Sequence, residues 1–134
     1  PTAGLDPVER IRFRNLLARL SKDRIVIFST HIVEDVAGSC NRLAVISSGR
    51  CIYAGTPQVM REQAVGKVWE AVLDEDYFHS LENDLAVITQ FRTPQGIRVR
   101  FLAEEAPTAF AAEQVEPTLE DAYIYLLGRH RRAA

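Results

Sequence analysis

The sequence predicts an α/β segment in the first half of the chain, followed by a small α+β unit. Helical and strand periodicities alternate within the first 40 residues, in the order helix, buried strand, helix. Short strands around turn residues dominate the second half, after a shift in composition near Val65, Gly66 and Lys67. We therefore place a boundary there and expect two domains, at residues 1–65 and 66–134.

The overall composition excludes several classes of protein. The 134 residues are 47% hydrophobic and 25% charged, which is typical of a globular protein with a real core. The formal net charge of −2 gives no support for nucleic-acid binding, which usually shows a strong basic excess. No apolar run approaches the roughly 20 residues of a membrane span, so membrane contact would come through a partner. Cys40 and Cys51 fit reduced thiols better than a disulfide, and neither has the neighbours of a metal site.

The first helix has a clear start signal. Asp6 can cap the free amides, Pro7 suits the first helical position, and Glu9 completes a capping box. The helix should run to about Leu20. Its apolar face comprises Phe13, Leu16, Leu17 and Leu20.

Residues 24–29 form a continuous apolar and β-branched run. Such a run predicts a strand buried on both faces, as in a parallel sheet covered by helices. Residues 32–40 then return to helical spacing, with Val33, Val36, Ala37 and Cys40 on one face. His31 lies between the two elements, at the carboxyl end of the predicted strand.

The remaining elements are shorter. Strands are expected at residues 43–47 and 50–54, joined by Ser48 and Gly49 in a tight hairpin turn, with a helix from Pro57 to about Ala64. The second unit should contain a strand at 68–73, a helix at 76–84, a hairpin of strands 85–92 and 96–102, and a last helix at 117–127 that Gly128 ends. Residues 103–112 carry no clear pattern.

His31 is the main candidate for chemistry. In open α/β sheets, ligands bind at the carboxyl edge of the strands. A histidine there can donate a hydrogen bond to a phosphate oxygen, or it can cap the next helix or fill a loop. Taken alone, the second interpretation is favoured, because a lone histidine is a weak signal.

Three segments together resemble the distal half of an ABC (ATP-binding-cassette) transporter nucleotide-binding domain, and the resemblance reverses that balance. Residues 2–7 (Thr-Ala-Gly-Leu-Asp-Pro) resemble the D-loop. The apolar run that leads to Thr30 and His31, with Glu34 three residues on, is similar to the switch-histidine motif. Residues 43–57 resemble the late hairpin that ends in Gly-x-Pro.

The resemblance implies roles for these residues. His31 would contact the γ-phosphate of ATP and help to position the attacking water, while Gly4, Leu5 and Asp6 would lie at the interface with a second ATPase subunit. A membrane permease would be the other partner, which would place the protein peripherally on the cytoplasmic face of the membrane. The implied fold is the distal part of a P-loop NTPase domain, followed by a C-terminal extension.

Several motifs of the family do not occur in the sequence. There is no phosphate-binding Gly-x-x-x-x-Gly-Lys-[Ser/Thr], no Leu-Ser-Gly-Gly signature and no strand that ends in Asp-Glu. The chain also begins at Pro1, without an initiator methionine. We therefore expect a C-terminal fragment that is inactive alone and binds no cofactor or metal, whereas ATP and Mg²⁺ would bind to the full-length parent. Strand edges exposed by such a cut could cause artificial self-association.

The tail leaves a second interpretation open. Residues 115–123 (Val-Glu-Pro-Thr-Leu-Glu-Asp-Ala-Tyr) resemble the motif that ends the ATPase subunits of many ABC exporters, including drug-resistance types, which favours export. The alternative is a non-catalytic α+β regulatory or dimerisation module in which His31 is incidental. An independent hydrolase that uses His31 with Asp6 or Ser29 is disfavoured, because no nucleophile or oxyanion motif accompanies them.

Overall fold

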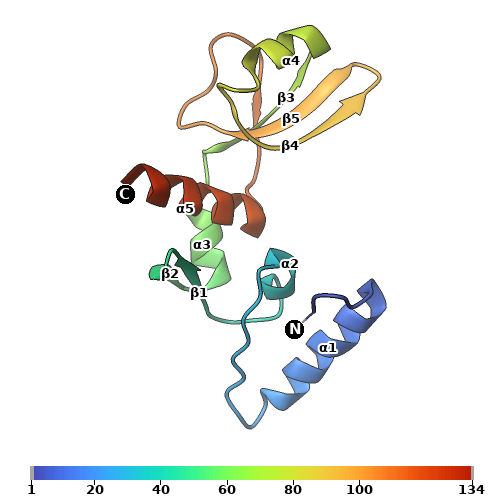
Figure 1. Cartoon of the computed structure of the whole chain (residues 1–134), viewed down its shortest axis with the longest axis vertical. Helices are drawn as coiled ribbons and strands as arrows, with labels where there is room; N and C mark the ends of the chain where they lie inside the picture. Colours follow the sequence, from blue (N-terminus) through green and yellow to red (C-terminus); the bar gives the residue numbers. More distant parts are fainter. Residues whose placement is uncertain (1, 134) are drawn as a thin grey trace. The chain divides into compact units, whose positions relative to one another are not determined.

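The computed structural model describes residues 2–133. Pro1 and Ala134 lie outside the described residues, and so does the observation that the sequence begins at Pro1 without an initiator methionine. The chain divides into two compact units, Pro1–Pro57 and Gln58–Ala134. Both contain helices and antiparallel strands, so the mixed α/β class predicted from the sequence is confirmed (Figure 1). The domain boundary at residues 65–66 refers to the layout of a nucleotide-binding protein and stays a prediction.

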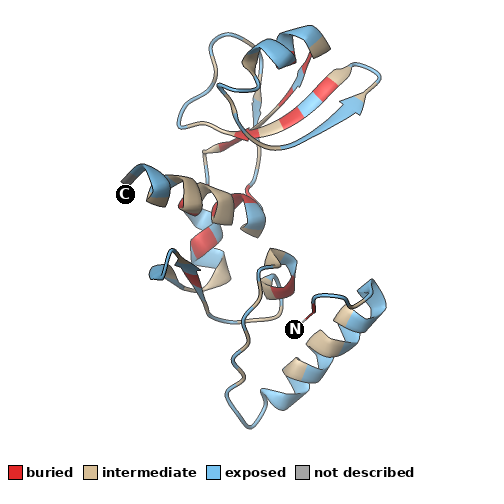
Figure 2. Cartoon of the chain, in the orientation of Figure 1, coloured by how far each residue is buried: buried red, intermediate tan, exposed pale blue. Residues whose placement is uncertain are grey.

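Helix α1 of the first unit, Pro7–Leu20, has the predicted bounds. Its capping box is formed: the Glu9 amide donates to Asp6 Oδ1 at 2.9 Å, and the Asp6 amide donates to Glu9 Oε2 at 3.2 Å. These two bonds satisfy amides that would otherwise have no partner at the helix start. None of its residues is fully buried, however: on the apolar face Leu16 and Leu20 are exposed, and Phe13 and Leu17 are half-buried (Figure 2).

The buried strand expected at residues 24–29 is wrong for this structure. These residues form no strand, and the side chains of Ile25 and Ile27 are each 90% exposed. A strand exists only through hydrogen bonds to a neighbouring strand. Within residues 2–133, no strand pairs with this segment. The helix expected at 32–40 is also shorter than predicted, because α2 covers only Val33–Val36.

The predicted hairpin of the first unit is confirmed. Strands β1 (Leu43–Ser47) and β2 (Arg50–Gly55) pair antiparallel, with a bulge between Val45 and Ile46. Ser48 and Gly49 have φ values of 50° and 73°. Positive φ at both central residues is the conformation whose twist matches the flanking strands.

The second unit is built on a four-stranded antiparallel sheet with the order β4-β5-β3-β6. The strands are β3 (Val68–Leu73), β4 (Ala86–Thr93), β5 (Gly96–Leu102) and the short β6 (Glu113–Gln114). Strand β5 is central and pairs with β4 through the predicted hairpin and with β3 on its other side (Figure 1). The sequence therefore predicted three of the four strands.

The core of the second unit lies on one face of this sheet. Alternate residues of β5 are buried, as a period of two requires. Helix α4 (Glu75–Leu81), capped by Asp74, contributes Phe78, which is 1% exposed. The buried cluster comprises Ala71, Leu73, Phe78, Ile97, Val99 and Phe101 (Figure 2).

Two further helices belong wholly or mostly to this unit. Helix α3 covers Pro57–Glu62 and buries Met60. Helix α5 covers Leu119–Ala133, so the prediction that Gly128 ends the last helix is wrong. Gly128 does not adopt the positive φ of a helix stop. A glycine inside a helix costs only about 1 kcal/mol relative to alanine, which the rest of the helix can offset.

Candidate functional site: the His31 segment and a buried carboxylate

The loop before α1 is a tight turn. The Leu5 amide donates to the Thr2 carbonyl at 3.0 Å, and Gly4 adopts a φ of +85° inside the turn. Glycine reaches this conformation without a steric penalty. The turn leads directly to Asp6, whose carboxylate caps the helix through the Glu9 amide. The residues predicted at a subunit interface thus form an exposed turn fixed to the start of a helix.

Thr30 shapes the loop that carries His31. Its hydroxyl accepts a hydrogen bond from the Ile32 amide at 3.0 Å and donates one to Asp35 Oδ2 at 3.1 Å. The His31 side chain is exposed, and no side-chain hydrogen bond or ion pair is formed by it within residues 2–133. The imidazole is therefore available to a ligand, while the backbone on both sides of it is held.

Asp35 is a buried carboxylate at the centre of this region. It is only 3% exposed, and Thr2, from the loop before α1, is 1% exposed. The Thr2 hydroxyl donates to Asp35 Oδ2, the same oxygen that accepts from Thr30. The loop at residues 2–6 and the His31 loop are thus joined through one carboxylate oxygen, although Thr2 and Thr30 lie 28 positions apart in the sequence.

Sequence reasoning found His31, Gly4, Leu5 and Asp6 but missed Asp35 and Thr2. The structure joins the two predicted segments through these missed residues. It forms no direct hydrogen bond or ion pair between Asp6 and His31 in the described part of the chain. The sequence gives little signal for Asp35, because it lies outside the apolar stripe of Val33, Val36, Ala37 and Cys40 and beside the acidic Glu34. Buried acids are rare unless their oxygens have partners.

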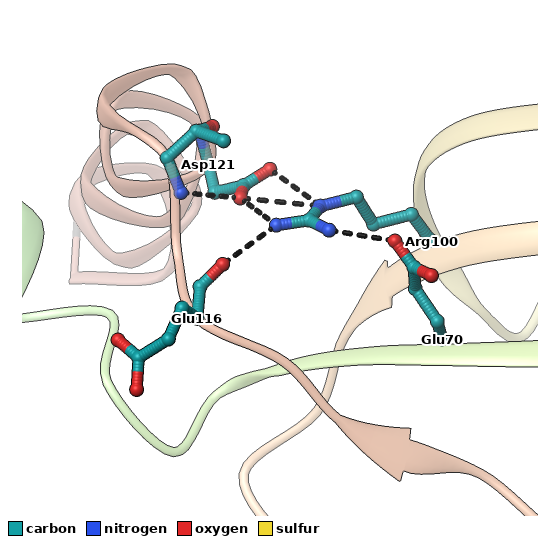
Figure 3. Close-up of polar contacts among 5 residues, drawn as sticks. Glu70, Arg100, Glu116 and Asp121 are labelled. Carbon is teal, nitrogen blue, oxygen red and sulfur yellow. Dashed lines mark hydrogen bonds and ion pairs between the residues drawn. The ribbon is translucent and has the colours of Figure 1, made fainter.

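The second unit holds its own polar cluster, centred on Arg100 of β5 (Figure 3). Its Nη1 donates to Glu70 Oε1 on β3 at 2.7 Å, and its Nη2 donates to Asp121 Oδ2 on α5 at 2.5 Å and to the Glu116 carbonyl at 2.9 Å. The hydrogen bond to Asp121 is the main reason that the pKa of Arg100 is raised. One guanidinium thus donates to three residues, Glu70, Glu116 and Asp121, and this arrangement indicates a structural role for Arg100 in holding β3, β5 and α5 together.

Two features are absent from the described residues. Among residues 2–133 there is no group of three His, Cys, Asp or Glu side chains that could hold a metal ion. None of the helices described is long and apolar enough to cross a membrane.

Comparison with curated proteins defines the class. The chain is similar over nearly its whole length to export ATP-binding proteins, which supports the predicted resemblance to an ABC transporter ATP-binding protein. No family model matches the chain.

Three of the relatives share a name. Nod factor export ATP-binding protein I of Rhizobium meliloti is 31% identical over 144 residues, which cover 96% of this chain and 41% of that protein. The protein of the same name from Cupriavidus metallidurans is 29% identical over 143 residues, covering 98% of this chain and 46% of the relative. For Rhizobium etli the identity is 30% over 142 residues, covering 96% and 44%. The chain spans less than half the length of these relatives.

Proposed function

We propose that the chain is the distal part of the nucleotide-binding domain, with its C-terminal extension, of an ABC transporter ATPase that powers export. The observation that carries the proposal is the alignment over 96% of the chain with proteins named for ATP binding and export. In this proposal residues 1–65 belong to the P-loop NTPase fold and residues 66–134 form the extension. Export is preferred to import because the relatives carry that word in their name.

His31 is the residue proposed to act on ATP. Phosphoryl transfer depends on positioning and on stabilising the charge that develops on the transferred group. An imidazole N–H directed at a γ-phosphate oxygen supplies one such donor, and it also restricts where the attacking water can lie. Support comes from the exposed ring of His31, which no side-chain bond within residues 2–133 engages.

Gly4, Leu5 and Asp6 are proposed to form the contact with a second ATPase subunit. Gly4 and Asp6 are exposed in the turn, and the Asp6 carboxylate is used in the helix cap. The turn would then present its backbone to the neighbouring subunit while its shape stays fixed by the cap. A membrane permease is the proposed second partner, with the protein at the cytoplasmic face of the membrane.

ATP and Mg²⁺ are proposed ligands of the whole ATP-binding protein. The described residues of this chain contain no phosphate-binding loop and no group of acidic ligands for the metal. No step of the proposal therefore runs through a metal held by this chain, and the chain alone is expected to be inactive. What this chain contributes is one hydrogen-bond donor and one interface loop.

The second unit supports a different role for the extension. Its sheet and its buried cluster are built wholly from residues 68–114, and none of the residues proposed to act on ATP belongs to it. This independence favours a regulatory or dimerisation module attached to the ATPase. Removal of residues 66–134 from the ATP-binding protein should then alter assembly or regulation more than the rate of the chemical step.

The test of the proposed function is His31→Ala in the ATP-binding protein that contains this chain. Loss of one preorganised donor should lower ATP turnover about 100-fold or more, while ATP binding changes little. His79→Ala is a matched control, because His79 is also exposed but lies on α4, outside the proposed site. Unchanged turnover in His31→Ala, with normal turnover in the control, would refute the role of His31.

A further inference from the structure

We propose that Asp35 is a positioning residue, which couples the loop at residues 2–6 to His31 through the hydroxyls of Thr2 and Thr30. The proposal rests on the proposed function, because it gives His31 a role in ATP turnover. It adds a residue that touches neither ATP nor the neighbouring subunit. Its effect would be to make the placement of the imidazole depend on the loop that meets the second subunit.

The contacts of Asp35 hold the His31 loop at two points. Through its side chain, Asp35 binds Thr30, the residue directly before His31. Through its backbone, the Asp35 amide donates to the carbonyl of Ile32, the residue directly after His31, at 3.1 Å. Both neighbours of the imidazole along the chain are therefore tied to one residue.

The other side of the link reaches the interface loop. Thr2 donates to Asp35 Oδ2, and the Thr2 carbonyl closes the turn by accepting from the Leu5 amide. Asp6, the next residue, is fixed by the capping box of α1. A movement of this loop must therefore break the Thr2 hydrogen bond or carry Asp35, and with it Thr30, along.

Each threonine hydroxyl can donate only one hydrogen bond, and both donate it to Asp35. A hydroxyl has one proton to donate, and Thr2 and Thr30 both direct theirs at the same carboxylate oxygen. Thr2 and Asp35 are nearly fully buried, so water offers little replacement for these bonds. No Lys, Arg or His forms an ion pair with Asp35 in the described part of the chain, which leaves the two hydroxyls as its side-chain partners.

A purely structural anchor makes a different prediction from a positioning residue. Loss of an anchor lowers the folded fraction of the protein, and the folded molecules keep their turnover. Loss of a positioning contact lowers kcat per folded molecule, because His31 is misplaced in the transition state, while KM for ATP stays close to its original value. The two roles can therefore be separated by a kcat against KM measurement normalised to folded protein.

The experiment uses the whole ATP-binding protein with Thr2→Val, Thr30→Val, Asp35→Ala and Asp35→Asn. Valine keeps the shape of threonine and removes only the hydroxyl. We expect each valine variant to lower kcat about three- to tenfold, and Asp35→Ala to lower it about tenfold or more, with KM within about twofold. Asp35→Asn, whose amide oxygen still accepts from both hydroxyls, should recover most of the rate. Thr108→Val is the matched control, because Thr108 is exposed and outside the link.

The decisive comparison is the double variant Thr2→Val with Asp35→Ala. If Thr2 acts through Asp35, removing its hydroxyl has no further effect once the carboxylate is gone. Effects that multiply, or a Thr2→Val variant that behaves like Thr108→Val, overturn the coupling. If Asp35→Ala does not fold, the same test is made with the double variant Thr2→Val with Thr30→Val, because Thr2→Val should have no further effect once the bond from Thr30 to Asp35 is gone. Normal turnover in His31→Ala would refute the proposed function itself, whereas a slow His31→Ala beside a normal Thr2→Val refutes only the coupling.

Discussion

The guanidinium of Arg100 and the carboxylate of Asp121 form the contact that fastens helix α5 to the sheet of the second unit. The side chain of Arg100 is 18% exposed and that of Asp121 is 3% exposed. Asp121 also accepts the Thr118 amide at 2.7 Å, so one carboxylate caps the helix and binds the strand (Figure 3). The Pro-Thr-Leu-Glu-Asp motif of the tail thereby has a physical explanation: its threonine and aspartate start the helix, and its aspartate docks it.

The first prediction concerns this pair. Arg100→Met keeps much of the side-chain volume but leaves Asp121 and Glu70 without their cation. Because removal of one partner from a buried ion pair leaves an uncompensated charge, the second unit should lose about 3 kcal/mol of unfolding free energy. Chemical denaturation of the chain, followed by the fluorescence of Trp69 on β3, measures the loss.

Arg92→Met is the matched control for this prediction. Arg92 pairs with Glu75, but its side chain is 77% exposed. Exposed pairs contribute about 0–1 kcal/mol, so the control should be nearly neutral. Equal losses of unfolding free energy in the two variants would show that the ion pairs of Arg100 stabilise the chain no more than an exposed pair does.

The second prediction compares a glycine that has no room for a side chain, Gly96, with one that has, Gly128. Gly96 has a φ of +134°, and a methyl group added to it would collide with the Leu73 carbonyl oxygen. Gly96→Ala should therefore cost at least about 2 kcal/mol in unfolding free energy. Gly128 lies inside α5 with nothing within 4 Å of an added Cβ, so Gly128→Ala should stabilise the chain by about 0.5–1 kcal/mol. Thermal unfolding of both variants checks the sign of each change.

The sequence predicted elements whose causes are local. The capping box of α1 and the turn at Ser48 and Gly49 depend on residues within three or four positions of each other, and both are confirmed. The strand at residues 24–29 depends on a neighbouring strand, which residues 2–133 do not supply. Local propensity therefore predicts such an element only when its partners are also present.

Long-range contacts explain what sequence reasoning missed in the candidate sites. The burial of Asp35 was not predicted because one of its two hydroxyl partners is Thr2, 33 positions away. Arg100 likewise looked like an ordinary strand residue, since Glu70 and Asp121 lie 30 and 21 positions away. Polar residues that alternate with a buried strand pattern are usually exposed, and only the fold shows which of them have buried partners.

The third prediction concerns the two thiols. Burial raises the pKa of Cys40 above its ordinary value of 9.0, whereas Cys51 is exposed on β2. Because the thiolate is the reactive form, Cys51 should react with iodoacetamide at pH 8 at least about tenfold faster than Cys40. Mass spectrometry of Cys40→Ser and Cys51→Ser, each followed over time, gives the two rates separately. In denaturant the rates should converge; a difference that persists there would contradict burial as the cause.

The last prediction concerns Lys67 and Glu104, whose Nζ and Oε2 atoms are 2.7 Å apart. The hydrogen bond from Lys67 is the main cause that lowers the pKa of Glu104 below its ordinary value of 4.5, and its counterpart raises the pKa of Lys67 above 10.5. The contribution of Glu104 to stability is therefore present above pH 4.5 and lost as the pH falls through its lowered pKa. That of Lys67 is present below pH 10.5 and lost as the pH rises through its raised pKa.

A pH titration that follows the NMR signal of the Glu104 carboxyl carbon tests the direction of the Glu104 pKa shift. In Lys67→Met the titration midpoint should rise toward 4.5, because the group that stabilises the ionised carboxylate is gone. Lys22→Met, an exposed lysine in the other compact unit, should leave the midpoint where it is. High salt should shift the midpoint in the unmodified chain in the same direction as Lys67→Met, since the pair is open to solvent and screened by ions. A midpoint that is the same in the unmodified chain and in Lys67→Met would show that Lys67 does not control the ionisation of Glu104.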